Sequence, residues 1–268
     1  MLKENKLRAL LEAGKPTLGT RILSSWPTVT EAVGATGQLD YIEFLAEYAP
    51  VNQYDLENIA RAAELHNMAT MIKVDFQNRG FVAQKALASG FQAVLFADHH
   101  SAAEVRETLR LVRPENPSCG GMMGFPNRRW IGFRSDAGNQ QDFIDMAIQS
   151  VIAFMIEKKE AVENIDEICS VPGVDMVQFG PYDYALSCGY NRDQAPGPER
   201  IQEAERKVIE SALKHGVRPR VEINDYKEAE PYIKLGVKDF NVGNELRVMA
   251  KFWTEQGKAL RELTGRAM

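Results

Sequence analysis

Residues 151–157 read Val151-Ile152-Ala153-Phe154-Met155-Ile156-Glu157, an unbroken apolar run that ends in a carboxylate. Such runs are typical of strands in parallel sheets, because those strands are buried on both faces. Burying a carboxylate at the end of a strand is costly unless a metal ion or a basic side chain neutralises it. We therefore expect a parallel strand here, with Glu157 bound either to a metal ion or to a base such as Lys158.

Seven further short runs of apolar or β-branched residues alternate with longer helical patterns. This alternation predicts a parallel sheet, and eight strands close a barrel. The chain length of 268 residues suits a one-domain barrel, which typically has about 250 residues. We therefore predict an α/β fold, a (β/α)8 TIM barrel formed by the single domain 1–268, with strands at 17–22, 40–45, 70–75, 93–98, 152–157, 175–180, 218–223 and 239–243.

The composition places the chain among ordinary globular proteins, with 44% hydrophobic and 26% charged residues. The net charge of −5 gives no basic surface for nucleic acid or for an anionic membrane. No apolar run reaches the roughly 18 residues of a membrane span, and the first residues lack the pattern of a signal peptide. The three cysteines are far apart in sequence, which favours a reducing compartment. We expect a cytoplasmic protein.

Polar residues stand at or just beyond the end of each predicted strand. Active sites of TIM barrels lie at the carboxyl ends of the strands, so these residues are candidates for a polar pocket at one mouth. Taken singly, each is as easily an ordinary solvated loop charge. The set consists of Arg21, Glu43, Glu47, Lys73, Asp75, Asp98, Glu157, Gln178, Asp183, Arg220, Glu222 and Glu245.

Two acids of this set follow neighbouring strands. Glu157 ends one predicted strand and Asp183 lies in the loop after the next. Adjacent parallel strands are about 4.8 Å apart, so the two carboxylates can reach the same ion. Carboxylate oxygens with open water positions suit a hard divalent cation, and they accept Mg²⁺, Mn²⁺ or Co²⁺.

Around these two acids the chain resembles the HpcH/HpaI aldolase family, the metal-dependent pyruvate aldolases related to citrate lyase β-subunits. The resemblance extends from about Gly19 to Gly243. It is strongest in two stretches, which contain Glu157 with Ala161-Val162 and Asn164-Ile165-Asp166, and Gly173-Val174-Asp175 with Gly180-Pro181-Tyr182-Asp183 and Ser187-Cys188-Gly189.

The resemblance implies that Glu157 and Asp183 bind the metal and that backbone amides around Gly180, Pro181 and Asp183 receive a substrate carboxylate. It also implies a lyase that cleaves or forms a carbon–carbon bond by aldol chemistry, through a metal-bound enolate of pyruvate or a related 2-oxoacid. A small-molecule 2-oxoacid is thus the expected substrate.

This sequence departs from the family pattern at the residues that move protons. The family's Asp and His after the second strand are Leu45 and Tyr48 here, although Glu47 is kept, and the family's arginine on the third strand is Lys73. We expect Lys73 to place a cation beside the substrate, and Glu47 or Tyr48 to guide the proton transfer. His99 or His100 is a second candidate for the missing base.

Other functions remain open at this point. The enolate can also serve a decarboxylase, a hydratase or an isomerase, and Lys73 can form a Schiff base if its pKa is depressed. A barrel that binds a ligand without turnover is a further alternative. Arg128 and Arg129, in a loop rich in proline and glycine, are candidate clamps for an anionic substrate.

The C-terminal residues 245–263 have apolar side chains at helical spacing. The family forms oligomers in which the last helix packs on a neighbouring subunit, so we expect a homo-oligomer, either a hexamer or another dimer-based assembly. The alternative is that this helix closes its own barrel.

Overall fold

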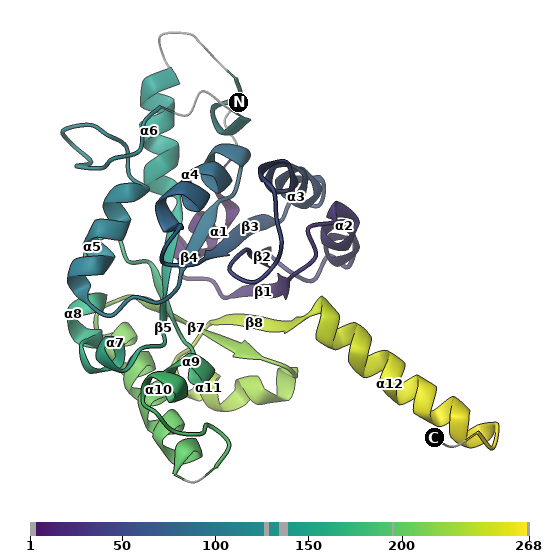
Figure 1. Cartoon of the computed structure of the whole chain (residues 1–268). Helices are drawn as coiled ribbons and strands as arrows, with labels where there is room; N and C mark the ends of the chain where they lie inside the picture. The colour runs from purple at the N-terminus through teal and green to yellow at the C-terminus, as the bar shows by residue number, and fades with distance from the viewer. Residues whose placement is uncertain (1–3, 126–128, 134–138, 195, 267–268) are drawn as a thin grey trace.

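The computed structural model describes residues 4–125, 129–133, 139–194 and 196–266. Its eight strands are all parallel and form a closed barrel in the order of the chain (Figure 1), so the predicted TIM barrel is confirmed. Every predicted strand is present; two have the predicted bounds, and the ends of the others shift by at most two residues. The strands are β1 (Thr17–Ile22), β2 (Tyr41–Leu45), β3 (Ala69–Val74), β4 (Ala93–Phe96), β5 (Val151–Ile156), β6 (Met176–Phe179), β7 (Arg218–Ile223) and β8 (Asp239–Asn244).

Helices follow the strands and cover the barrel from outside. Two of them end at glycines with left-handed backbone, Gly90 (φ 112°) and Gly236 (φ 99°), as their position before a strand predicts. The helices are α1 (Lys6–Glu12), α2 (Pro27–Ala35), α3 (Gln53–Leu65), α4 (Arg79–Ser89), α5 (Ala102–Leu111), η1 (Arg129–Ile131), α6 (Asn139–Gln149), α7 (Lys159–Glu163), α8 (Ile165–Cys169), α9 (Pro181–Ser187), α10 (Gly197–Lys214), η2 (Tyr226–Glu228), α11 (Ala229–Leu235) and α12 (Glu245–Leu263).

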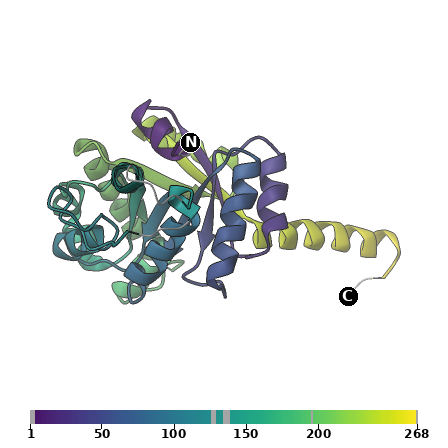
Figure 2. The same ribbon diagram turned by 90° about the horizontal axis from the view of Figure 1, so that it is seen from above.

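The last helix, α12, leaves the barrel and projects into solvent (Figures 1 and 2). None of its residues is buried. It does not cover the outer face of β8 and β1, where Leu18 is 43% exposed. The alternative that α12 closes its own barrel is therefore wrong for this structure. Among the described helices, none has the length and hydrophobicity that a bilayer span requires.

The register of β5 and β6 brings together the loops that follow these two strands. Ile156 at the end of β5 pairs with Phe179 at the end of β6. The next residues, Glu157 and Gly180, therefore leave the barrel side by side. A Cβ atom on residue 180 would lie 2.7 Å from the Cβ of Glu157, so only glycine lets the two loops come this close.

The barrel interior combines apolar and charged side chains. Met71, Leu95 and Met155 belong to a buried apolar cluster. Next to this cluster, the guanidinium of Arg220 contacts the sulfur of Met71 at 2.7 Å and donates a hydrogen bond to the carboxylate of Glu43. The side chains of Arg220 and Glu43 are almost fully buried. The prediction that Glu43 and Arg220 face the mouth of the barrel is wrong. The residues that reach the mouth from the same strands, Leu45 and Glu222, lie two positions further along the chain.

We predict that Glu43→Gln lowers the free energy of unfolding by about 3 kcal/mol, because it leaves the buried Arg220 without a compensating charge. Urea denaturation of the variant and of the wild type measures the difference. Glu31→Gln makes the same change on the exposed surface of α2 and should have no effect beyond about 0.5 kcal/mol. Equal stability of Glu43→Gln and wild type would contradict the prediction.

Candidate active site at the carboxyl ends of the strands

A cavity of about 480 Å³ opens at the carboxyl ends of the strands. Side chains from β3, β6 and β7 and from the loops after β2 and β5 line it, together with residues of α9, α10 and the first turn of α12. Apart from Glu47, which pairs with Lys73, all of the leading candidates for catalysis, substrate binding and metal binding line this cavity. These residues are Tyr48, Lys73, Glu157, Gly180, Pro181 and Asp183.

Backbone groups fix the carboxylate of Glu157 on two sides. The side chain is only 1% exposed. Its Oε1 accepts a hydrogen bond from the amide of Asp98 at 3.0 Å. Asp98 has left-handed backbone (φ 64°), which aspartate tolerates better than most residues. On the other side Gly180 approaches so closely that a Cβ atom there would lie 2.7 Å from Oε2 of Glu157.

The charge on Glu157 is not neutralised by an ion pair. Burial raises the pKa of Glu157 to about 7; Lys73 opposes the rise, and the negative charge of Asp183 adds to it. Lys158, the alternative partner, binds Asp98 at 2.6 Å instead. Within the described residues, no basic side chain lies within ion-pair distance of either Glu157 or Asp183.

This pair of acids fits a hard divalent cation. Two carboxylates face one cavity, and both lack a paired base among the residues that the structure describes. The same residues contain no group of three or more His, Cys, Asp or Glu side chains that could hold a metal ion. A metal at Glu157 and Asp183 would thus take its remaining ligands from water and substrate, which is the usual arrangement for Mg²⁺.

Lys73 lies at the same mouth and is held by two neighbours. Its Nζ is 2.6 Å from Oε2 of Glu47 and donates to the hydroxyl of Tyr48 at 3.0 Å. Burial alone would lower the pKa of Lys73, but the carboxylates of Glu157 and Glu47 outweigh it and raise the pKa. The lysine is therefore a cation at neutral pH, which argues against the Schiff-base alternative.

The hydroxyl group of Tyr48 keeps its proton at neutral pH. Desolvation raises the pKa of Tyr48 to about 12, although the nearby Lys73 opposes the rise. The ammonium group of Lys73 also lies over the tyrosine ring, 4.9 Å from its centre. A phenol in this position is a proton donor, and the adjacent cation stabilises the phenolate that proton donation leaves.

Only part of the predicted amide cradle is available. The amide of Gly180 donates to the carbonyl of Ile156 at 3.1 Å, and Pro181 has no N–H. The amides of Tyr182 and Asp183 lie in the first turn of α9, where an amide has no acceptor within its own helix. The amides that can bind a substrate carboxylate are therefore those of Tyr182 and Asp183.

The two histidines after β4 do not line the cavity. His99 is fully buried, with Nδ1 2.8 Å from the carbonyl of Ala97 and Nε2 2.7 Å from the hydroxyl of Thr108. Burial lowers the pKa of His99 to about 4, so the ring is neutral. His100 lies at the surface beside Glu104. A catalytic role for either histidine is therefore not supported.

Arg129 is not a clamp at this mouth. Its guanidinium pairs with Glu64 at the end of α3 and donates to the carbonyl of Ser89 at 3.2 Å. Those groups lie at the opposite end of the barrel, where α3 and α4 finish. Arg128 lies outside the described residues.

Three other strand-end residues do contribute to the cavity wall, as predicted: Arg21, Gln178 and Glu222. Arg21 pairs with Glu222, which also accepts a hydrogen bond from Nε2 of Gln178 at 2.6 Å. The remaining strand-end acids bind groups in neighbouring loops. Asp75 accepts a hydrogen bond from the side chain of Asn78, and Asp98 pairs with Lys158. Glu245 accepts hydrogen bonds from the amides of Leu23 and Ser24.

Three wall residues were not predicted from the sequence, because none of them follows a strand of the barrel directly as the predicted residues do. Arg192 lies in the connection between α9 and α10, over the ring of Tyr182, 3.7 Å from its centre. Glu205 lies on α10 and accepts a hydrogen bond from Tyr232 at 3.1 Å. Arg247 belongs to the first turn of α12.

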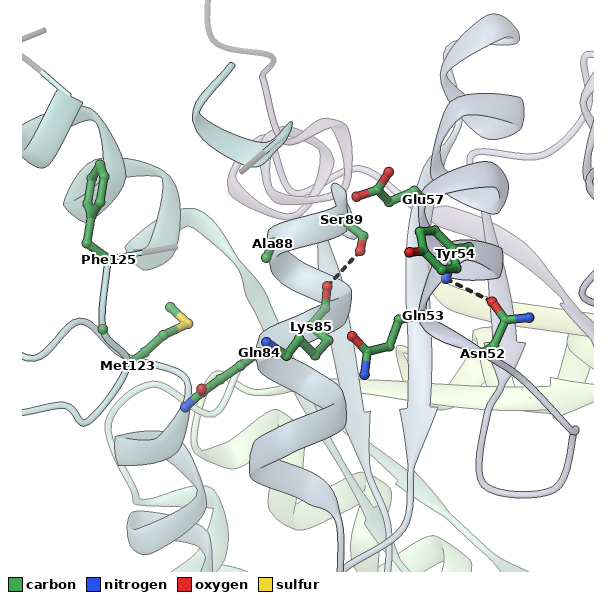
Figure 3. A pocket seen from close by; sticks show the side chains of 11 residues that line it. Asn52, Gln53, Tyr54, Glu57, Gln84, Lys85, Ala88, Ser89, Met123 and Phe125 are labelled. Atoms are coloured by element: carbon green, nitrogen blue, oxygen red, sulfur yellow. Dashed lines mark hydrogen bonds between the residues drawn. The ribbon is translucent and has the colours of Figure 1, made fainter. Parts of the chain in front are cut away.

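Two larger cavities, of about 710 Å³ each, lie elsewhere on the barrel. Figure 3 shows one of them, beside α3 and α4; its lining includes Tyr54, Gln84, Lys85, Met123 and Phe125. It lies on the flank of the barrel and contains none of the predicted site residues. The other contains Arg8 and Arg129, each of which is paired with an acid.

Comparison with known proteins gives consistent results. The sequence model of the HpcH/HpaI aldolase/citrate lyase family matches residues 25–250. A 4-hydroxy-2-oxo-heptane-1,7-dioate aldolase of Escherichia coli is 26% identical over 251 residues, 92% of each chain. A hydroxypyruvate/pyruvate aldolase of Paraburkholderia phytofirmans is 22% identical over 237 residues, 87% of this chain and 89% of that one. The crystal structure of an HpcH/HpaI aldolase from Desulfitobacterium hafniense superposes with a TM-score of 0.83 at 24% identity, covering 98% and 99% of the two chains.

We predict that Mn²⁺ binding weakens as the pH falls below about 7. The pKa of Glu157 is about 7, so the side chain is charged above this pH and protonated below it. A protonated carboxyl must lose its proton before it can bind a cation, and the Kd should therefore rise by up to about tenfold per pH unit. Calorimetric titration with MnCl₂ at a series of pH values measures this. A Kd that stays constant from about pH 7 to 5 would contradict the assignment.

Proposed function

The chain belongs to the HpcH/HpaI aldolase/citrate lyase family and is a pyruvate-type aldolase, and we propose that it makes or breaks the carbon–carbon bond through the enolate of pyruvate or a related 2-oxoacid. The observation that carries this proposal is the unpaired couple of Glu157 and Asp183 in a cavity that also contains Lys73. The named relatives favour the aldol outcome over decarboxylation, hydration or isomerisation. The cytoplasmic location expected from the sequence stays a prediction.

Glu157 and Asp183 are the residues that would hold a divalent metal, either Mg²⁺, Mn²⁺ or Co²⁺. When bound, such a cation is a Lewis acid that stabilises negative charge on the keto oxygen of a 2-oxoacid. The amides of Tyr182 and Asp183 would orient the carboxylate of that substrate. Lys73 would place its positive charge on the same side, with Glu47 holding the ammonium group in position.

Tyr48 would supply the proton that the aldol reaction needs. In the synthetic direction the enolate carbon attacks the carbonyl carbon of the acceptor, a carbon–carbon bond forms, and the carbonyl oxygen becomes an alkoxide. That oxygen takes the proton of the Tyr48 hydroxyl, and the phenolate left behind is stabilised by Lys73. In this chain, therefore, a tyrosine–lysine–glutamate group would do the work that the family assigns to histidine and aspartate.

We predict that Glu157→Gln weakens Mn²⁺ binding by at least about 100-fold and lowers aldol activity towards pyruvate and an aldehyde by at least about 1,000-fold. Calorimetry and a coupled assay measure the two effects. Glu160→Gln makes the same change three residues away on an exposed site of α7 and should behave like the wild type. Normal metal binding by Glu157→Gln would refute the ligand assignment.

Tyr48→Phe keeps the ring beside Lys73 and removes only the hydroxyl. We expect kcat to fall by about 100-fold, the lower range for loss of a general acid, while Mn²⁺ and oxalate bind with unchanged affinity. Tyr54→Phe, which removes a hydroxyl from a 78% exposed side chain on α3, is the matched control. A wild-type kcat in Tyr48→Phe would exclude this tyrosine as the proton donor.

We also propose that α12 joins two copies of the chain. The helix presents an apolar face that no part of its own barrel covers, including Phe252 (58% exposed) and Trp253 (64% exposed). In the part of the chain that the structure describes, no helix covers Leu18 on the outer face of β1, and this side chain is exposed. Burying one large apolar side chain is worth about 1.5–3 kcal/mol, so exchange of α12 between copies would stabilise a dimer, the unit from which a hexamer can be built.

The double variant Phe252→Glu/Trp253→Glu should therefore be monomeric under conditions in which the wild type is an oligomer, because two charges cannot be buried in an apolar contact. Light scattering after size-exclusion chromatography gives the mass of each species. Lys258→Glu, on the polar side of α12, is the control and should keep the wild-type mass. A monomeric wild type would rule out this interface.

A further inference from the structure

A further cavity, of about 450 Å³, lies beside the last turn of α5. Its wall includes Ile148, which precedes β5, and Val171 and Pro172, which precede β6. Segments that lead into parallel strands lie at the amino ends of those strands, so this cavity lies towards the opposite end of the barrel from the mouth with Glu157. The two cavities share no lining residue.

Three arginines line this cavity: Arg106, Arg110 and Arg113. They are four and three residues apart, so their side chains leave the same face of α5 and of the turn that ends it. Among the described lining residues there is no acid, and none of the three guanidinium groups has an ion-pair partner there. Like charges at this spacing repel one another, and an anion in the cavity would relieve that repulsion.

The guanidinium groups are not needed to satisfy the end of α5. Basic side chains near the end of a helix often bind its last carbonyl groups. In this chain the amide of Met122 donates to the carbonyl of Arg110 at 2.7 Å, and the amide of Met123 donates to the carbonyl of Arg113 at 2.9 Å. The loop that follows the helix therefore does what the arginine side chains would otherwise do.

Most N–H groups of the three arginines remain available to a ligand. Each guanidinium has five N–H donors. The side chain of Arg110 donates to the carbonyl of Gly120 at 3.3 Å, and that of Arg113 donates to the carbonyl of Ala147 at 2.6 Å. Within the described ranges the side chain of Arg106 makes no hydrogen bond. The cavity thus presents many donors and three positive charges.

Arg113 is the part-buried member of the three, and its charge is only partly compensated. Burial lowers the pKa of Arg113, and the negative charge of Asp175 opposes this effect. However, both carboxylate oxygens of Asp175 already accept hydrogen bonds from Arg8, at 2.6 and 2.7 Å. A charge that is removed from water needs a counterion, and the open cavity is the side from which one can reach Arg113.

We propose that this cavity binds a small phosphate monoester whose organic part is apolar or aromatic. Arginines bind phosphate oxygens through pairs of parallel hydrogen bonds, and a phosphate monoester carries a charge of about −2 at neutral pH. Leu109, Ile148 and Val171 supply apolar surface for the organic part. A volume of about 450 Å³ lies within the range of about 300–1,000 Å³ that is usual for small-molecule sites.

Phenyl phosphate is the probe, and inorganic phosphate and phenol are the comparisons. Calorimetric titration is done at about 0.15 M ionic strength, where attraction between distant exposed charges is screened. The wild type should bind phenyl phosphate at a single saturable site, at least about fivefold more tightly than inorganic phosphate, because only the ester buries an apolar group. Phenol lacks the charge and should give no measurable heat of binding.

The double variant Arg106→Gln/Arg110→Gln should weaken phenyl phosphate binding by at least about tenfold, because charge-assisted hydrogen bonds are lost. Both positions are exposed and Arg113 stays in place, so the fold should be retained, and wild-type Mn²⁺ binding verifies this. Arg261→Gln/Arg266→Gln removes the same two charges at exposed positions near the end of the chain, and should bind phenyl phosphate like the wild type.

Three results would overturn the inference: no saturable binding of phenyl phosphate by the wild type, equal affinity for phenyl phosphate and inorganic phosphate, or undiminished binding by Arg106→Gln/Arg110→Gln. In the last case the phosphate occupies another part of the chain. None of these results bears on the proposed aldol reaction, because the cavity contains no residue of the proposed active site.

Discussion

The buried carboxylate of Glu157 is held by backbone rather than by a base, and the mouth of the barrel is arranged around it. The amide of Asp98 and the close approach of Gly180 hold it from two strands, and both contacts need unusual backbone: left-handed in one case, glycine in the other. A carboxylate in this position strongly favours a cation, because burial and the neighbouring acid both disfavour its charged form.

The surrounding ion pairs preserve this arrangement. Lys158 is occupied by Asp98 and Lys73 by Glu47, so neither base reaches within ion-pair distance of Glu157. Deeper in the barrel the Glu43–Arg220 pair satisfies its own charges and stays out of the cavity. The result is a mouth in which two acids remain for a metal and Lys73 lies beside them.

The sequence was sufficient to predict the eight strands and the main pair of acids. Continuous apolar runs mark buried parallel strands, and a residue that directly follows such a run must lie at the mouth, as Glu157 does. The predictions were wrong where the position of a side chain depends on its depth in the barrel or on its packing against other elements. A shift of two residues along a strand moves Glu43 from the mouth into the core, and His99 turns inward to pack against Phe154. The position of Arg129 depends on the path of a long loop, and the position of Arg247 depends on where α12 begins. Neither can be predicted from the residues nearby in the sequence.

The most direct measurement is the crystal structure of the protein with Mn²⁺ and oxalate, a planar mimic of the enolate of a 2-oxoacid. The account predicts one anomalous peak between the carboxylates of Glu157 and Asp183, with oxalate bound to the same ion and lying beside Lys73. Manganese bound elsewhere, or oxalate seated in the cavity away from these two acids, would contradict it.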